Sequence, residues 1–210
     1  MNPIGEFPSE IKKKLIALRR DLHQHPELSF KEEQTSLRLF NELKSLHVDS
    51  VERVAGTGVI ARIKGQDRKA PVIALRGDID ALPIQEESKL KFASTNPGVM
   101  HACGHDIHAS WIVVAAYSLI QKPAAGDVVL ILQPAEEVGK GALAMIKAGA
   151  LKGVKAIFGA HVDRRFPVGQ VVTQEGPLAA SSDEFHIELI GRGAHAARPH
   201  EALDPIIGAS

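Results

Sequence analysis

Four short runs of β-branched and aliphatic residues constrain the fold of this chain more than any other feature. They lie at residues 59–63, 72–75, 128–132 and 156–158. Stretches of helical character lie between some of them, near residues 108–121 and 141–149. Short apolar runs that alternate with helices are typical of a layered sheet whose faces carry helices. The sequence therefore predicts an α/β fold.

Two helices are predicted ahead of these strands. In the first, apolar residues recur at the spacing that one face of a helix requires; they are Ile11, Leu15, Leu18 and Leu22. The second helix carries the apolar residues Leu37, Phe40, Leu43 and Leu46. The segment before it, from Ser29 to Glu32, has the Ser-x-x-Glu form of a capping box, which predicts that the second helix starts there.

Polar side chains cluster just after three of the predicted strands. The strands that end at residues 75, 132 and 158 are followed by Asp78 and Asp80, by Glu136 and Glu137, and by His161. Ligands of open α/β sheets bind beyond the carboxyl ends of the strands, so these side chains are expected to converge. A loop with Cys103 and His105 leads into a predicted helix and could complete the ring. We therefore expect one site at this edge of the sheet.

The loop before that helix is unusually rich in side chains that bind metals. Between residues 100 and 108 lie the only cysteine of the chain, three histidines and an aspartate. Cysteine binds metals as a thiolate and histidine as a neutral imidazole, so Cys103 and His105 can offer two donors to zinc or a similar ion. The segment points to metal chemistry.

The pattern of apolar and polar residues changes near residue 182. Apolar Phe185, Ile187 and Leu189 alternate with polar residues, which is typical of a half-exposed antiparallel strand. A further helix is expected to begin near Asp204 and Pro205. The pattern predicts a second, smaller domain that starts at residue 182.

Composition argues against several classes of partner and location. Lys and Arg together number 25, as do Asp and Glu, and only 4% of residues are aromatic, so nucleic acid is not the expected partner. The longest apolar stretch, residues 111–120, is far shorter than the ~20 residues that span a bilayer. Residues 1–8 do not resemble a secretory signal, and one cysteine allows no internal disulfide, so we expect a cytoplasmic protein.

Five motifs in a fixed order resemble a known family. They are RGDIDALP at 76–83, MHACGH at 100–105, QPAEE at 133–137, GAHV at 159–162 and GAHA at 193–196. With LHQHPEL at 22–28, they closely resemble the amidohydrolase branch of the M20 metallopeptidases, which includes hippurate hydrolases, aminoacylase-like enzymes and auxin-conjugate hydrolases. The resemblance implies a zinc-peptidase-like catalytic domain over residues 1–181 and an incomplete lid domain over residues 182–210.

The resemblance also implies an activity and a metal centre. Members of this branch hydrolyse the amide bond of N-acyl amino acids with two divalent ions, zinc or manganese. Carried over by motif, Glu136 is the general base that takes a proton from a metal-bridged water. The implied metal ligands are Cys103, His105, Glu137 and His161.

Two further residues have implied roles. Asp80 is expected to orient a ligand imidazole by accepting its hydrogen bond, and His195, on the lid, to polarise the scissile carbonyl. Asp78 stands where many M20 relatives have histidine, and we do not expect it to be a ligand. Family chains also run further and supply one more histidine ligand, so one metal site is expected to be incomplete here. The resemblance allows a homodimer through the lid domain.

Two alternatives to this activity stay open. The chain could bind metal or ligand without turnover, as an incomplete fragment. It could instead be a thiol hydrolase with Cys103 as nucleophile, although the paired glutamates would have no role there. The remaining histidines are expected to be ordinary hydrogen-bonded core or surface residues: His23, His25, His47, His101, His108, His186 and His200. The acyl group, the amino acid and the native metal are not predicted.

Overall fold

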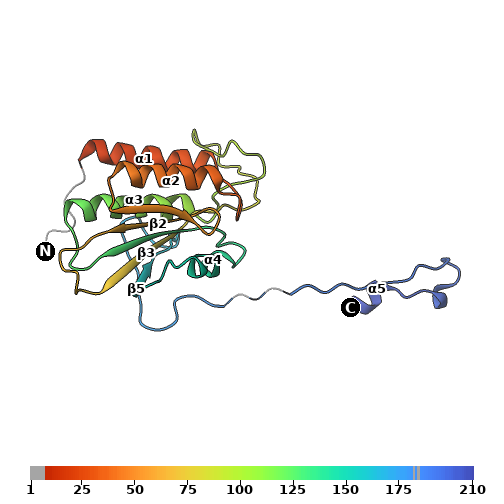
Figure 1. The fold of residues 1–210 in the computed structure, drawn as a ribbon. Helices are drawn as coiled ribbons and strands as arrows, with labels where there is room; N and C mark the ends of the chain where they lie inside the picture. Colours follow the sequence, from red (N-terminus) through yellow and green to blue (C-terminus); the bar gives the residue numbers. More distant parts are fainter. Residues whose placement is uncertain (1–7, 182, 184) are drawn as a thin grey trace. The chain divides into compact units, whose positions relative to one another are not determined.

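A mixed sheet of five strands forms the centre of the first of two units in this computed structural model (Figure 1). The structure describes residues 8–181, 183 and 185–210, and its units are Met1–Arg164 and Arg165–Ser210. The strand order is β1-β2-β4-β3-β5, and β3 runs parallel to both β4 and β5. The bounds are β1 Ser50–Val54, β2 Gly58–Ile63, β3 Val72–Asp78, β4 Val128–Gln133 and β5 Val154–Gly159. The carboxyl ends of three neighbouring parallel strands therefore share one edge.

Helices cover both faces of this sheet, as Figure 1 shows. On one face, α1 (Ser9–Gln24), α2 (Glu33–Ser45) and α3 (His105–Gln121) pack their apolar residues against alternate side chains of β2 and β4. On the other face, α4 (Gly141–Lys147) packs through Met145. All six residues of β4 are buried, because both faces of this central strand are covered. The predicted α/β fold is confirmed.

The predicted elements of this unit match the structure with one omission. Strands β2 to β5 and helices α1 to α4 lie where the apolar patterns indicate. Strand β1 was not predicted, because its sequence, SVERV, has no apolar run. It pairs with β2 alone in the described sheet, and three of its five residues are exposed. An edge strand of this kind needs no continuous apolar pattern.

The capping-box interpretation of Ser29 and Glu32 is wrong. Helix α2 begins one residue after Glu32, whose side chain makes no cap hydrogen bond. The Glu27 carboxylate instead accepts hydrogen bonds from the N–H groups of Gln34 at 3.2 Å and Thr35 at 2.8 Å. Ser29 Oγ instead donates to Asp80 Oδ2 at 2.7 Å. The buried Glu32 carboxylate accepts hydrogen bonds from Thr57 Oγ1 at 2.5 Å and from the Ala135 N–H at 2.9 Å. Glu27 therefore caps α2, while Ser29 and Glu32 bond to distant segments.

The second unit contains little regular structure. Its described residues form no strand, so the strand predicted through Phe185, Ile187 and Leu189 is wrong, and these three side chains are exposed. A strand needs a partner to pair with, and the described part of this unit offers one isolated bridge, between Arg192 and Leu203. The short helices are η1 (Pro199–Glu201) and α5 (Pro205–Ala209).

The predicted start of the last helix is confirmed, because the Asp204 side chain accepts a hydrogen bond from the Ile206 N–H. Ser182, where we place the domain boundary, lies outside the described residues, and this boundary stays a prediction. Residues 1–7, on which the expectation about a secretory signal rests, also lie outside them.

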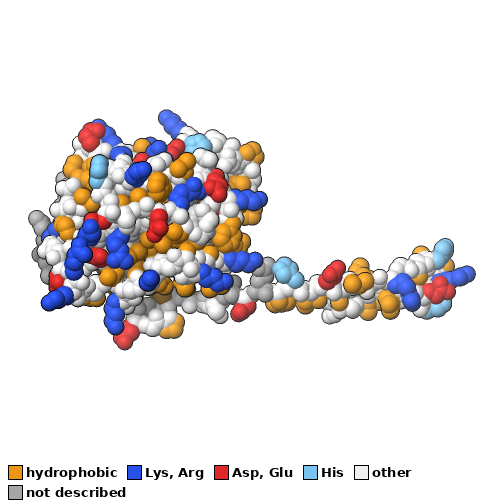
Figure 2. Space-filling model, in the orientation of Figure 1, with side chains coloured by type: hydrophobic (Ala, Val, Ile, Leu, Met, Phe, Trp, Pro, Cys, Tyr) orange, Lys and Arg blue, Asp and Glu red, His pale blue; other side chains and the backbone are white. Residues whose placement is uncertain are grey.

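Basic and acidic side chains are both spread over the face of the first unit seen in Figure 2. This mixture agrees with the equal numbers of the two types in the sequence. None of the helices in the described ranges has the length and apolar character that a bilayer crossing demands.

Candidate metal and catalytic site

The shared edge of β4, β3 and β5 gathers the polar side chains that the sequence singles out. Asp78 ends β3, the segment after β4 carries Glu136 and Glu137, and His161 follows β5. Cys103 and His105 reach the same place from the start of α3. Ligand atoms of three overlapping groups lie within 4.8 Å of one another: Cys103, His105 and His161; Asp78, His105 and His108; and His105, Glu136 and Glu137.

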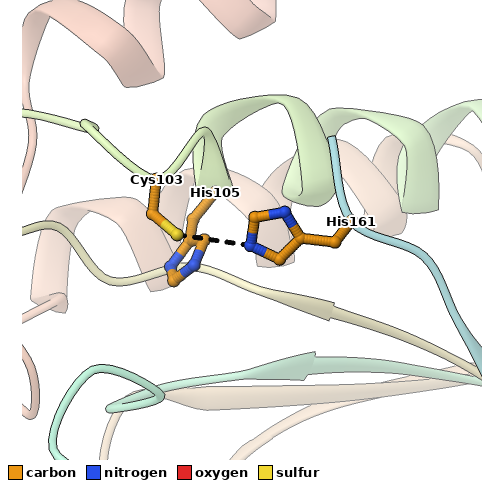
Figure 3. Close-up of side chains that lie close together, drawn as sticks. All are labelled: Cys103, His105 and His161. Atoms are coloured by element: carbon orange, nitrogen blue, oxygen red, sulfur yellow. Dashed lines mark hydrogen bonds between the residues drawn. The ribbon is translucent and has the colours of Figure 1, made fainter. Parts of the chain in front are cut away.

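Cys103, His105 and His161 form the first of these groups (Figure 3). Cys103 Sγ lies 3.2 Å from His161 Nε2, while His105 is fully buried beside them. Gly104 makes this approach feasible. Its φ of +84° is a left-handed conformation, and a Cβ there would lie only 2.5 Å from Val162 Cγ2. Thus the glycine between the two ligand candidates lets the His161 segment pack against the loop.

His105 is oriented by Asp80. His105 Nδ1 lies 2.9 Å from the Asp80 carbonyl oxygen and 3.3 Å from Asp80 Oδ1, so Nδ1–H donates and Nε2 carries the free lone pair. Within the described residues, this buried Nε2 has no hydrogen-bond partner. Glu137 Oε1, at 3.7 Å, is buried and also lacks one there. Buried polar atoms without partners are costly, and a cation bound by both would satisfy them. The residues fit a divalent metal.

Asp80 joins three segments of the site. Its Oδ2 accepts hydrogen bonds from Ser29 Oγ at 2.7 Å and from the Glu137 N–H at 3.0 Å. Burial by itself raises the pKa of Asp80, but the hydrogen bonds from His105 and Ser29 outweigh burial and lower it. Asp80 is therefore held as a carboxylate in contact with His105, the contact that the sequence-based role requires.

Asp78 has both carboxylate oxygens engaged by other side chains. Oδ1 lies 2.5 Å from His108 Nδ1, and Oδ2 lies 2.6 Å from Arg76 Nη1. Although burial opposes the shift, the His108 hydrogen bond and the positive charges nearby lower the pKa of Asp78 to about 2. These contacts support the expectation that Asp78 is not a ligand, although Oδ1 lies 3.6 Å from His105 Nε2.

The site carries an excess of negative charge. Burial, followed by the charge of Glu137, raises the pKa of the Cys103 thiol to about 12. Burial also raises the pKa of Glu137, and the carboxylates of Glu136 and Asp80 add to this shift while His105 opposes it. A thiol nucleophile needs a depressed pKa, so the arrangement argues against a Cys103-dependent hydrolase. A divalent cation would reverse these shifts.

The two glutamates sit on a tightly held loop after β4. Ala135 has a φ of +50°, a left-handed conformation, and its N–H donates to the buried Glu32 carboxylate. The Glu137 N–H is held by Asp80, which leaves the Glu137 side chain mostly buried and Glu136 41% exposed. Glu136 Oε2 lies 4.0 Å from His105 Nε2. Glu137 thus faces the buried His105 imidazole, and Glu136 is accessible to solvent.

Sequence reasoning missed the roles of Ser29 and Glu32 in this site. Both lie just after the LHQHPEL run, and their Ser-x-x-Glu spacing suggested a helix cap instead. The interpretation of His23 as a hydrogen-bonded core residue is confirmed by its contacts with Asp106 at 2.8 Å and Glu86 at 3.2 Å.

His101 differs from the sequence-based expectation. It is buried, yet neither of its ring nitrogens has a hydrogen-bond partner within the described chain. Burial lowers the pKa of His101 to about 4, so the ring is neutral at pH 7.

His195 belongs to the second unit. Its exposed side chain accepts a hydrogen bond from the Ala197 N–H through Nδ1 at 3.1 Å. The polar edge of the sheet belongs to the other unit, and the role of His195 stays a prediction.

The fold and the donor set define a metal-ligating α/β domain with a carboxylate beside its ligands. Residues 74–207 match the description Peptidase family M20/M25/M40. The chain belongs to this family, as its motifs indicate.

Its relatives include named amide hydrolases. The chain is 50% identical over 200 residues to the N-acetylcysteine deacetylase of Bacillus subtilis (strain 168), covering 93% of this chain and 52% of that protein. It is 43% identical over 210 residues to the N-acyl-L-amino acid amidohydrolase of Geobacillus stearothermophilus, covering 98% and 56%. The chain thus spans about half the length of these curated relatives.

A solved structure agrees in fold. The Bacillus subtilis YXEP protein, described as a dinuclear metal-binding peptidase of the M20 family, superposes with a TM-score of 0.78 at 48% identity. The match covers 81% of this chain and 49% of that one.

Proposed function

We propose that this protein is a metal-dependent amidohydrolase that cleaves the amide bond of N-acyl amino acids. The observation that carries the proposal is the pair of buried atoms, His105 Nε2 and Glu137 Oε1, that lack partners in the described structure beside the open carboxylate of Glu136. The names of the relatives supply the substrate class, since two of them act on N-acetylcysteine and N-acyl-L-amino acids.

Cys103, His105, Glu137 and His161 would hold two divalent ions, zinc or manganese. Bound there, such ions supply Lewis-acid chemistry and lower the pKa of a coordinated water. The thiol of Cys103 favours zinc, whereas the imidazoles and the carboxylate accept either metal. Because the closely matched structure is described as dinuclear, two ions are proposed rather than one.

Glu136 is the proposed general base. Its side chain is more exposed than that of Glu137, so it can reach both solvent and substrate. A carboxylate placed there can take a proton from the attacking water and return it to the leaving amine. Asp80 holds His105 and the Glu137 backbone in place while this happens. His195 is proposed to polarise the scissile carbonyl from the second unit.

A cytoplasmic location and a homodimer through residues 182–210 belong to the same proposal. The first rests on the single cysteine, and the second on the resemblance of the motifs.

Glu136→Gln, compared with Cys103→Ala, tests the proposal. Each protein is loaded with zinc or manganese, its metal content is measured by plasma mass spectrometry, and amine release is followed from N-acetyl and N-benzoyl amino acids. We expect Glu136→Gln to retain its metal and lose about 10²- to 10⁴-fold in turnover, and Cys103→Ala to lose metal. Turnover by Glu136→Gln at the wild-type rate would refute the base assignment.

Metal binding without turnover is a second candidate function. It is supported by the candidate ligand groups themselves, whose donor atoms lie within 4.8 Å of one another. Stoichiometric metal without hydrolysis of any substrate in the panel would support this second candidate.

A further inference from the structure

His108 makes one hydrogen bond with each of its ring nitrogens. The Val162 N–H donates to His108 Nε2 at 3.0 Å, so this nitrogen carries a lone pair. The proton therefore resides on Nδ1, which donates to Asp78 Oδ1 at 2.5 Å. Asp78 is held in turn by Arg76, whose Nε donates to Gln133 Oε1 at 2.9 Å. His108 is thus fixed in one tautomer, and both of its nitrogens are already occupied.

Val162, which His108 holds through its N–H, also orients the His161 ring. The Val162 carbonyl accepts a hydrogen bond from His161 Nδ1 at 2.7 Å, which leaves His161 Nε2 facing Cys103 Sγ. The Val162 side chain also packs over Gly104, where an added Cβ would lie 2.5 Å from Val162 Cγ2. Val162 therefore donates its N–H to His108 and orients the His161 imidazole through its carbonyl.

The aromatic packing supports the same arrangement. The His108 ring stacks on Trp111 with centroids 4.6 Å apart and planes at 15°. The His161 ring meets His108 edge-on, with centroids 4.5 Å apart and planes at 75°. His161 itself is exposed, unlike the fully buried His105. An exposed side chain loses conformational entropy when it is ordered for binding, so contacts that order it in advance strengthen the site.

We infer that His108 is a positioning residue that presents His161 to the metal through the backbone of Val162, with Asp78 fixing the His108 tautomer. This inference rests on the proposed function, in which His161 is a ligand. It gives Asp78 a role in the site that requires no metal contact, and it explains why the His108 side chain is completely buried against a site it does not ligate.

The two amides His108→Asn and His108→Gln separate this role from simple packing. Asparagine can reach Asp78 with its amide but is too short to accept the Val162 N–H. Glutamine extends to the position of Nε2 and can supply an acceptor oxygen there. Both variants replace the ring by a neutral polar side chain, so they disturb the Trp111 stacking alike. The difference between them reports the Val162 contact.

Zinc affinity, measured by competition with a chromophoric chelator, is the readout. We expect His108→Asn to bind zinc 10- to 100-fold more weakly than wild type, the size of effect known for residues that orient ligands. His108→Gln is expected to stay within about threefold of wild type. In His108→Asn, the cobalt–thiolate absorption band from Cys103 should shift, as it should in His161→Ala. Circular dichroism of the metal-free proteins checks that the variants fold.

Each outcome decides something. Equal zinc affinity of wild type and both variants would overturn the positioning role while leaving the proposed function intact. An equal loss in both variants would also overturn it, because the Val162 contact would then not matter. Should His108→Asn fail to fold, Val162→Pro, which lacks the N–H, must show the same weakening for the inference to stand. Absence of zinc binding by wild type would overturn both the inference and the proposed function.

Discussion

His105 Nε2 lies 3.7 Å from Glu137 Oε1, and both atoms are buried without a hydrogen-bond partner in the described part of the chain. Two buried polar atoms without partners destabilise a fold unless a ligand binds to them. Burial lowers the pKa of His105, but the hydrogen bond to Asp80 and the surrounding carboxylates outweigh it and raise the pKa. A cation bound by both atoms would satisfy them and balance the acidic cluster.

Zinc should therefore stabilise the protein through these two atoms. At a free zinc concentration 100 times the dissociation constant, binding adds about 2.7 kcal/mol to the free energy of unfolding, which corresponds to a rise in Tm of about 5–10 °C. Thermal unfolding with and without zinc measures this. His105→Ala should lose most of the rise, whereas His25→Ala, at an exposed histidine, should keep it. An equal rise in His105→Ala would contradict the assignment.

Asp80→Asn should weaken zinc binding without removing any ligand. Asparagine cannot match a carboxylate that faces His105 and accepts from both Ser29 and Glu137. We expect a 10- to 100-fold loss of zinc affinity, measured by chelator competition. Ser29→Ala removes only one of these hydrogen bonds, so its loss should be smaller. A greater loss in Ser29→Ala than in Asp80→Asn would show that Asp80 does not organise the site.

Glu32→Gln should destabilise the fold near the catalytic loop. The buried carboxylate uses one oxygen for Thr57 and the other for the Ala135 N–H, and glutamine has only one acceptor oxygen. Glutamine can still donate to the Thr57 hydroxyl, but both hydrogen bonds to the carboxylate become neutral ones, which should cost about 1–2 kcal/mol in the free energy of unfolding by urea. The matched control is Glu33→Gln, which breaks an ion pair of an exposed glutamate with Arg53 and should cost less than about 1 kcal/mol. Equal effects of the two changes would disprove the bridging role.

Gly141→Ala tests the geometry of the loop after β4, which carries Glu136 and Glu137. A Cβ at Gly141 would lie 1.5 Å from the Pro134 carbonyl oxygen, so the backbone before Glu136 has to move. We expect both a loss of stability and weaker zinc binding, because Glu137 shares that loop. Gly139→Ala is the comparison, since open space surrounds Gly139 but its φ is +65°. Gly139→Ala should cost only about 1 kcal/mol of backbone strain and leave zinc affinity unchanged.

The sequence was sufficient to predict most of the sheet and the edge that carries the site. Apolar runs mark β2 to β5 because these strands pack against helices, and polar residues follow them where parallel strands end. Motif resemblance then singled out Cys103, His105 and His161, whose ligand atoms do lie together.

The missed features depend on contacts between distant segments. Glu32 looks like a helix cap by its spacing, yet its partner Ala135 lies 103 residues away. His108 looks like an ordinary core histidine, and only the fold brings the Val162 N–H to its ring. Local pattern carries no information about such pairs, because the same side chain satisfies either a local or a remote donor equally well.

Asp127 offers a test of electrostatics away from the site. Its carboxylate precedes β4, at the opposite end from Glu136, and accepts hydrogen bonds from the Gly65 N–H and from Arg62, each at 3.0 Å. The Gly65 hydrogen bond, followed by the hydrogen bond and the charge of Arg62, lowers the pKa of Asp127, although burial opposes this shift. A carboxylate with a lowered pKa in the folded state stabilises the protein above its unfolded pKa, about 4, and this stabilisation disappears as the pH falls through the folded value.

Asp127→Asn should therefore cost about 1 kcal/mol at pH 7, and its free energy of unfolding should fall less steeply than that of wild type below about pH 4. Urea unfolding across this pH range measures the difference, and zinc affinity at pH 7 should be unchanged. Parallel pH dependences for the two proteins would show that Asp127 does not contribute through its charge.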